Sequence, residues 1–164
     1  MKKVLLFLLV LFLTACSDET YVTTLAEPTP DQELLPNDAG CSLSISKDVY
    51  TDPAPFFEIT LKNESPISYE YGEYYRIDVY KEDKWYIMTH SDAVFLENPR
   101  FTNLGLLLPP GREVHQTFFV KLLGVTLVPG EYRLVKIFQT PKEPFYVVTL
   151  AVPFTVEDTV LIGI

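Results

Sequence analysis

The sequence predicts an all-β domain in which about seven antiparallel strands form two sheets that pack face to face as a β-sandwich. Three observations indicate this class. From residue 41 onward, short segments alternate apolar and polar residues and are separated by turn residues. No stretch of the chain shows a convincing helical period. Aromatic residues, mostly Tyr and Phe, make up 13% of the chain, which suits a β-rich core.

The alternation is clearest in the middle of the chain. In PFFEITLKN, residues 55–63, the side chains of Phe57, Ile59 and Leu61 share one face of the strand, and polar side chains share the other. YYRIDVY at 74–80 repeats the pattern. Each sheet should therefore have one apolar and one wet face, and two apolar faces bury one another in a sandwich.

The other strands are recognised from their turn signals. KEDK at 81–84 is expected to form a hairpin loop. Residues 93–108 are expected to hold one short strand near 104–108 with a loop before it. Pro153 indicates an edge or a bulge in the last strand, because proline has no N–H for a ladder. The remaining strands are expected at residues 41–46, 85–88, 112–120, 130–139 and 145–156.

Residues 1–15 are organised as a secretory signal peptide. Met1, Lys2 and Lys3 form a short positive region, and VLLFLLVLFL at 4–13 supplies ten consecutive apolar residues. A membrane-spanning helix needs about 20 residues, so this run is typical of a signal peptide. Small residues then lead to Cys16.

LTAC at 13–16 resembles the lipobox of bacterial lipoproteins. The resemblance implies that the Cys16 thiol receives a diacylglycerol, that a signal peptidase cuts before it, and that Cys16 becomes the lipid-anchored N-terminus. The protein would then lie on the extracytoplasmic face of the cell membrane, or on the outer membrane in a Gram-negative cell. An ordinary secretory signal and an uncleaved membrane anchor remain alternatives.

Residues 16–40 are expected to form a mobile acidic spacer between the membrane and a domain at 41–158. The segment 17–40 holds six acidic residues, no Lys or Arg, and three prolines that interrupt regular structure. A partner-binding segment around Leu34 and Leu35 is the alternative. Without Lys2 and Lys3 the chain keeps 11 basic residues against 22 acidic ones, a net charge of −11. Such a surface repels phosphate backbones, so nucleic-acid binding is not expected.

Three segments carry a resemblance to a known family. VPGEYRLVKIF at 128–138 resembles the PGxYxL pattern of Ig-like and fibronectin-type domains, which implies that Tyr132 forms a tyrosine corner with nearby backbone. A half-buried strand tyrosine is the alternative. With the runs at 69–88 and 107–122, the chain resembles a bacterial Ig-like domain of the kind seen in Gram-positive surface lipoproteins. The resemblance implies an Ig-like sandwich over about residues 43–140 and no catalytic residues.

No side chains form a catalytic or metal-binding pattern, and no cofactor or enzymatic activity is expected. Cys41 would be a lone thiol, either filling space at a strand edge or cross-linking two copies. His115 is expected on the wet face of its strand, and His90 in a loop. His90 and Asp92 alone do not make a zinc site, which needs three or four ligands.

The run YEYGEYY at 69–75 is the candidate binding site. Tyrosine provides rigid amphipathic contact area at low entropic cost, and Gly72 would permit a positive φ or a close backbone approach. The alternative places alternate tyrosines in the core. The candidate aromatic patch comprises Tyr69, Tyr71, Tyr74, Trp85 and Tyr86.

These features predict a lipid-anchored, extracytoplasmic binding or structural module. It would contact the membrane through Cys16 and an unknown protein, peptide or envelope polymer through an edge strand or the tyrosine run. The alternatives are a small envelope hydrolase that uses His90 or His115 and a solute-binding lipoprotein.

Overall fold

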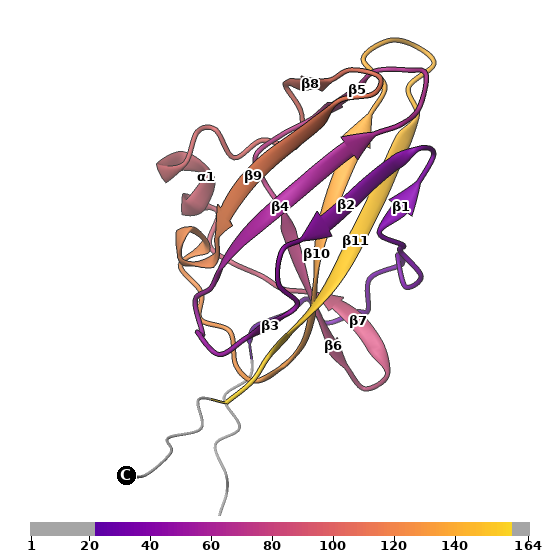
Figure 1. The fold of residues 1–164 in the computed structure, drawn as a ribbon. Helices are drawn as coiled ribbons and strands as arrows, with labels where there is room; N and C mark the ends of the chain where they lie inside the picture. Colours follow the sequence, from indigo (N-terminus) through magenta and orange to yellow (C-terminus); the bar gives the residue numbers. More distant parts are fainter. Residues whose placement is uncertain (1–21, 159–164) are drawn as a thin grey trace, which may run out of the picture.

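The computed structural model describes residues 22–158, which fold into two sheets packed face to face (Figure 1). The predicted all-β sandwich is confirmed. The expected signal peptide, Cys16 and the start of the spacer lie outside the described residues. Within residues 22–158, no helix is of a length and hydropathy to cross a membrane.

The first sheet has four antiparallel strands in the order β1-β2-β4-β9. They are β1 (Asn37–Asp38), β2 (Cys41–Ile45), β4 (Phe56–Asn63) and β9 (Glu113–Phe119).

The second sheet has seven strands. Its path β3-β11-β10-β5-β8 carries a side branch in which β6 pairs with β10 and β7 pairs with β6. Only the β3–β11 pair is parallel. The strands are β3 (Val49–Tyr50), β5 (Tyr69–Tyr71), β6 (Arg76–Lys81), β7 (Lys84–Ile87), β8 (Leu106–Leu108), β10 (Gly130–Gln139) and β11 (Val147–Val156). Two short helices, α1 (Ala93–Glu97) and the 3-10 helix η1 (Val120–Leu123), connect strands.

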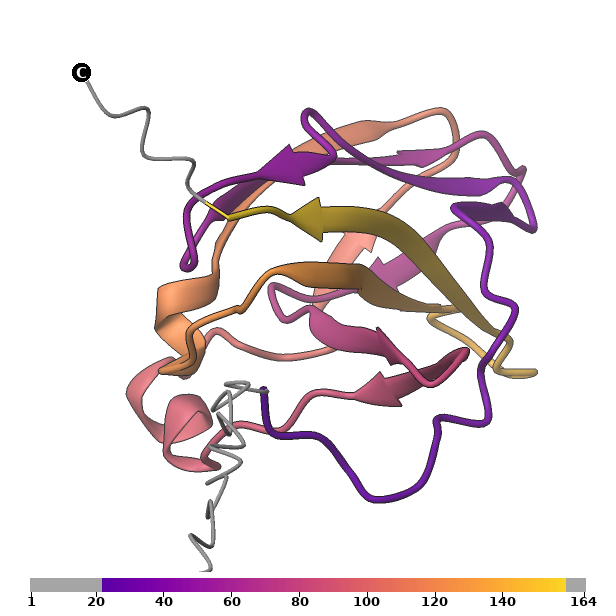
Figure 2. The ribbon, with the colours of Figure 1, turned by 90° about the horizontal axis from the view of Figure 1, so that it is seen from below.

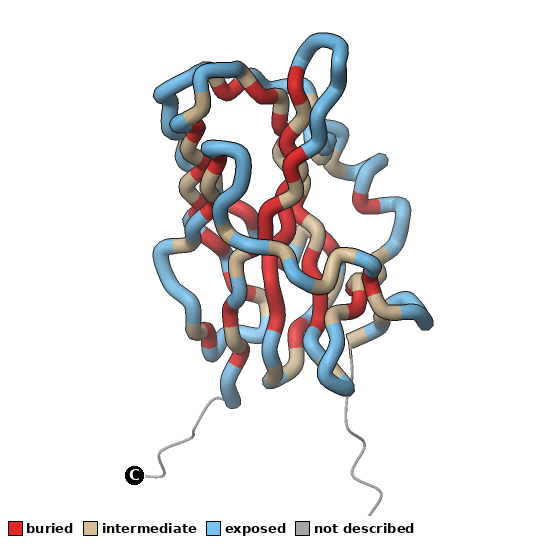
Figure 3. Tube along the Cα trace, turned by 90° about the vertical axis from the view of Figure 1, so that its right-hand side faces the viewer, coloured by how far each residue is buried: buried red, intermediate tan, exposed pale blue. Residues whose placement is uncertain are grey.

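The core lies between the sheets, as the alternation predicts. Phe57, Ile59 and Leu61 of β4 are buried, and buried side chains of β10 and β11 face them. The rings of Phe57 and Phe154 meet edge to face with centroids 4.7 Å apart. Figure 3 shows buried positions recurring along the strands, with exposed ones at turns.

Several elements differ from the sequence prediction. The strands β1, β3 and β5 and the helix α1 were not expected, because two to five residues are too few to show a period. The hairpin loop is also tighter than expected. Lys81 pairs with Lys84, and only Glu82 and Asp83 form the turn, both with positive φ.

Pro153 occupies an edge position, and no bulge forms there. The β10–β11 register continues through the Arg133–Pro153 pair. On the other side of β11, the amides of Ala151 and Thr155 donate to the carbonyls of Leu35 and Asp48. An N–H at residue 153 would lie between these two contacts and point away from β10. Its absence in proline therefore costs no hydrogen bond of the β10–β11 ladder.

Residues 22–36 lie against the second sheet, unlike the expected spacer. Residues 23–29 run antiparallel to β7: the Leu25 amide donates to the Ile87 carbonyl at 2.9 Å, and the Thr29 amide to the Trp85 carbonyl at 2.9 Å. Figure 2 shows this indigo segment passing along the outside of the sheet before it reaches β1. The prolines prevent a regular strand, but the backbone between them finds partners on β7. We call residues 22–36 the docked segment.

Candidate binding groove

The strand β9 has one free edge. It is the last strand of its sheet and pairs, within residues 22–158, only with β4. Figure 1 places β8, the end of the other sheet's path, and α1 on the same side of the molecule as β9.

A groove of about 720 Å³ lies along this free edge. The segment 97–101, which begins at the last residue of α1, forms one wall, and β9 forms another. The lining combines polar and apolar side chains, among them Tyr71, Glu73, Arg100, Phe101, Leu106 and Gln116.

The backbone of β9 presents unpaired groups to this side. The amide of Val120 donates to the Pro55 carbonyl, and the carbonyl of Arg112 accepts from the Asn63 amide. In an antiparallel ladder, alternate residues point to the same side, so residues 114, 116 and 118 face β4. The amides and carbonyls of 113, 115, 117 and 119 therefore point outward, and none bonds to another described residue.

The floor of the groove is held by Gln116, whose side chain reaches the opposite sheet. Its Oε1 accepts from the Tyr75 hydroxyl at 2.5 Å, and its Nε2 donates to the Gly72 carbonyl at 3.3 Å. Burial raises the pKa of Tyr75, so this hydroxyl stays protonated and donates. These contacts fix the edge of β9 relative to the loop between β5 and β6.

Gly72 is required at its position by a close backbone approach. A Cβ at residue 72 would lie 1.7 Å from the carbonyl oxygen of Thr102. The Tyr74 amide donates to the same carbonyl at 3.1 Å. Of the two roles considered for Gly72, the close approach is the observed one, and it holds the segment after α1 against the β5–β6 loop.

Lys136 lies beneath this loop, on the core face of β10. Its Nζ donates to the carbonyls of Gly72 and Tyr74 and lies 3.9 Å from the centroid of the Tyr75 ring. Burial lowers the pKa of Lys136 to about 7, although the charge of Glu73 opposes the shift. The lysine thus connects the core to the loop that carries Glu73, a groove residue.

The predicted aromatic patch does not form one surface. Tyr69 and Tyr71 are 3% and 5% exposed and belong to the core, as the alternative interpretation of the run held. Tyr86 is buried as well, while Trp85 lies half-buried beside Tyr80 and the docked segment. Tyr74 packs elsewhere, against the rings of Phe95 and Phe101.

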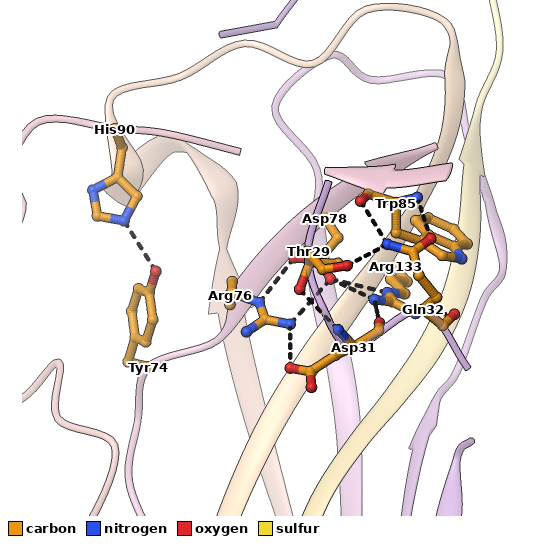
Figure 4. Close-up of polar contacts among 9 residues, drawn as sticks. All are labelled: Thr29, Asp31, Gln32, Tyr74, Arg76, Asp78, Trp85, His90 and Arg133. Atoms are coloured by element: carbon orange, nitrogen blue, oxygen red, sulfur yellow. Dashed lines mark hydrogen bonds and ion pairs between the residues drawn. The ribbon is translucent and has the colours of Figure 1, made fainter. Parts of the chain in front are cut away.

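The two histidines have separate environments. The Nε2 of His90 lies 3.0 Å from the Tyr74 hydroxyl (Figure 4). His115 is on the wet face, as predicted, with Nδ1 3.0 Å from the Thr60 hydroxyl and Nε2 3.3 Å from a Glu113 oxygen. Hydroxyl, imidazole and carboxylate thus line up on the outer face of β4 and β9. The His115 side chain is 75% exposed, so water competes for each contact.

A buried ionic cluster fastens the docked segment to the other sheet (Figure 4). Asp78 is fully buried and accepts from Nε and Nη2 of Arg133 at 3.0 and 2.8 Å, and from Nε of Arg76 at 2.8 Å. Arg133 also donates to the backbone carbonyls of Asp31 and Gln32. Burial lowers the pKa of Arg133, and Asp78 opposes that shift.

Gln32 completes this attachment by acting as a strand partner for one residue. Its side-chain oxygen accepts from the Trp85 amide at 3.0 Å, and its nitrogen donates to the Trp85 carbonyl at 3.1 Å. The Arg133 guanidinium lies 4.5 Å from the centroid of the Trp85 ring. Trp85 is therefore covered by the chain's own residues rather than open to a ligand.

Two further predicted residues have clear environments. The Tyr132 hydroxyl donates to the Val128 carbonyl at 2.6 Å, which is the tyrosine-corner contact that the resemblance implied. Cys41 is a free thiol, 1% exposed, and burial raises its pKa to about 11. In the described part of the chain, no three His, Cys, Asp or Glu side chains gather in a way that could hold a metal ion.

Sequence reasoning missed the groove and the ionic cluster, although signals for both were present. Lys136 interrupts the apolar stripe formed by Tyr132, Leu134 and Phe138. Asp78 belongs to the polar face predicted for residues 74–80, and Arg133 is a charged residue in the predicted strand 130–139. Their burial depends on the docked segment, which lies 42 or more residues away in the sequence.

The comparisons with known proteins give one match. A family model described as a bacterial Ig-like domain matches residues 37–155, from the start of β1 to the last residue but one of β11. The search of curated proteins returned no match. The matched range leaves out the docked segment and includes the entire β9 edge.

Proposed function

Since the chain belongs to the bacterial Ig-like domain family, which indicates an extracytoplasmic binding or structural module, we propose a more specific role for it. The protein is anchored to the cell membrane by a lipid on Cys16, and it binds an extended segment of an envelope protein along the free edge of β9. The observation that carries the binding role is the row of outward backbone groups at residues 113, 115, 117 and 119 beside an open groove.

The anchor rests on the sequence around Cys16. A positive start, a ten-residue apolar run and LTAC stand in the order that a lipoprotein signal requires. Mass spectrometry of the mature amino terminus tests it. We expect a diacylglyceryl cysteine at residue 16. Recovery of a chain that retains residues 1–15, or of an unmodified Cys16, would contradict the anchor.

An extended peptide is the occupant that matches the edge. Outward groups at every second residue repeat at about 6.8 Å along a strand, which is the spacing at which another strand offers its own amides and carbonyls. The groove also supplies apolar contacts for alternate side chains of the bound strand, from Phe101, Leu106 and Phe119. A polysaccharide lacks this regular pattern of backbone donors and acceptors.

The test uses seven-residue peptides selected from a random display library on the purified protein. The Thr117→Pro variant removes one outward N–H and leaves the β4 ladder intact, because residue 117 does not bond to β4. Thr117→Ala is the matched control. We expect Thr117→Pro to weaken binding of the selected peptides at least tenfold, and Thr117→Ala to bind as the wild type does.

Hydrogen exchange provides a second readout for the same peptides. Bound peptide should slow exchange of the amides at 113, 115, 117 and 119, while those at 114, 116 and 118 are already protected by β4. Selected peptides that bind without protecting the outward amides would rule out strand addition at β9.

A small envelope hydrolase is the second candidate. It is favoured by the alignment of Thr60, His115 and Glu113 in the order of nucleophile, base and acid. The test is hydrolysis of a panel of activated esters by the wild type and by Thr60→Val. Turnover that is lost in the variant, with unchanged unfolding, would favour this candidate over the binding role.

A further inference from the structure

The most exposed large apolar side chain in residues 22–158 is Leu96 of α1, at 85%. The helix is held to the domain by Val94, which is buried, and by one side of Phe95, whose ring packs against Tyr74 and His90. Phe95 remains 40% exposed. The two neighbouring side chains form an apolar tip that the rest of the described chain does not cover.

A short stretch of chain connects this tip to the place where the described fold begins. The Thr89 amide donates to the Thr23 carbonyl at 2.9 Å, and Thr24 pairs with Met88. Four residue steps separate Thr89 from the start of α1 at Ala93, which is at most about 14 Å of chain.

The chain between Val22 and Cys16 is short. Six residue steps span at most about 21 Å even when fully extended. The docked segment releases no further length, because it is bonded to β7 and to Arg133. A lipid on Cys16 therefore keeps the membrane within reach of α1.

The charges near the tip are mixed. Glu73 lies 3.5 Å from Arg100, Asp92 precedes α1, and Glu97 lines the same hollow as Lys121. Contact of Phe95 and Leu96 with lipid therefore depends on their apolar surface and on the anchor rather than on charge attraction, and neutral headgroups suffice for it.

We propose that Phe95 and Leu96 of α1 rest in the interfacial layer of the membrane that holds Cys16, so that the domain has one fixed orientation on the lipid. This inference depends on the lipid anchor proposed above. Apolar side chains at a helix tip are the kind that enter the headgroup boundary when an anchor holds them there. The groove, whose wall begins at Glu97, then opens next to the membrane surface.

The test uses the full lipidated chain in phosphatidylcholine vesicles, with a polarity-sensitive fluorophore on Leu96→Cys. Labelling is specific, because Cys41 is buried and a lipidated Cys16 has no thiol. Leu35→Cys is the matched control: Leu35 is 62% exposed and lies near β11, far from α1. We expect a blue shift and at least twofold quenching by spin-labelled lipid at residue 96, and neither at residue 35.

The outcomes separate the two proposals. Protein that fails to float with the vesicles and lacks lipid on Cys16 contradicts the anchor itself. Protein that floats, but whose label at residue 96 is not quenched, overturns the orientation and leaves the anchor in place. Equal quenching at residues 35 and 96 also overturns it, because the domain would then have no fixed face toward the lipid.

Discussion

The edges of β7 and β9 differ in whether the chain's own backbone covers them. The edge of β7 is closed by residues 23–29, whose backbone bonds to Ile87 and Trp85. The edge of β9 has no such cover among residues 22–158 and borders a groove. An uncovered edge invites pairing with other chains. The docked segment therefore removes β7 as a place for such pairing, whereas β9 stays available for it.

The two buried cations of β10 show the same contrast. Arg133, near the closed edge, is paired with the carboxylate of Asp78. Lys136, on the other face of the strand, has only backbone carbonyls and tyrosine rings around its Nζ. The closed edge is therefore held by full charges, and the loop beside the open edge by a cation without a carboxylate in contact.

The largest expected effect comes from breaking the closed edge at Asp78. Asp78→Ala leaves Arg133 buried without its partner, and we expect a loss of about 3–5 kcal/mol in the free energy of unfolding. Urea denaturation measures it. Asp31→Ala, which removes a partly exposed carboxylate 3.5 Å from Arg76, should cost about 1 kcal/mol or less. Equal losses in the two variants would argue against a buried cluster.

Next in size is a pH effect from Lys136. Its pKa is about 7 in the folded protein and 10.5 for an unperturbed lysine, so the unfolded chain binds more protons between these pH values. Stability should therefore rise with pH in this window, by about 2 kcal/mol from pH 7.5 to pH 9. Below pH 7 the lysine is charged in both states, and its contribution becomes constant.

The measurement for Lys136 is urea unfolding at several pH values up to 9. The Cys41 thiol of the unfolded chain also begins to ionise in this range and lowers stability, but equally in the wild type and in both variants below. Lys136→Met should lose most of the rise, whereas Lys84→Met, on the exposed hairpin, should keep it. A rise of the same size in Lys136→Met would show that the lysine is not its source.

A smaller effect is expected from Gln32→Ala, which loosens the closed edge without removing a charge. The variant loses the side-chain bonds to both backbone groups of Trp85, at a cost of about 1–2 kcal/mol. Hydrogen exchange should accelerate at the amides of Leu25 and Thr29 and stay unchanged in the β4–β9 ladder. Faster exchange in that ladder as well would mean that the docked segment and the sandwich unfold together.

The smallest effect is expected at the open edge. Glu113→Gln removes the exposed contact with His115 and should change the free energy of unfolding by about 0.5 kcal/mol or less. Thermal or urea unfolding of the variant and the wild type under the same conditions measures it. A loss above 1 kcal/mol would show that this edge is held more firmly than its exposure indicates.

The fold could be predicted from the sequence because apolar and polar residues alternate along a long strand that is buried on one face. Phe57, Ile59 and Leu61 are an example, and the tyrosine corner at Tyr132 follows a local pattern. The docked segment was not accessible, since its partners on β7 and β10 lie far along the chain. The groove could not be predicted either. It depends on which strand lies at the edge of the sheet, and the alternation of apolar and polar residues does not determine the order of the strands.

The docked segment also determines how the molecule would respond to mechanical load. If the anchor and the partner are as proposed above, a pull between them enters the described fold at Val22 and acts first on the contacts of residues 23–33 with β7 and Arg133. Those contacts would give way before the ladders of either sheet, and about fifteen residues of slack would then be released while the sandwich stays folded.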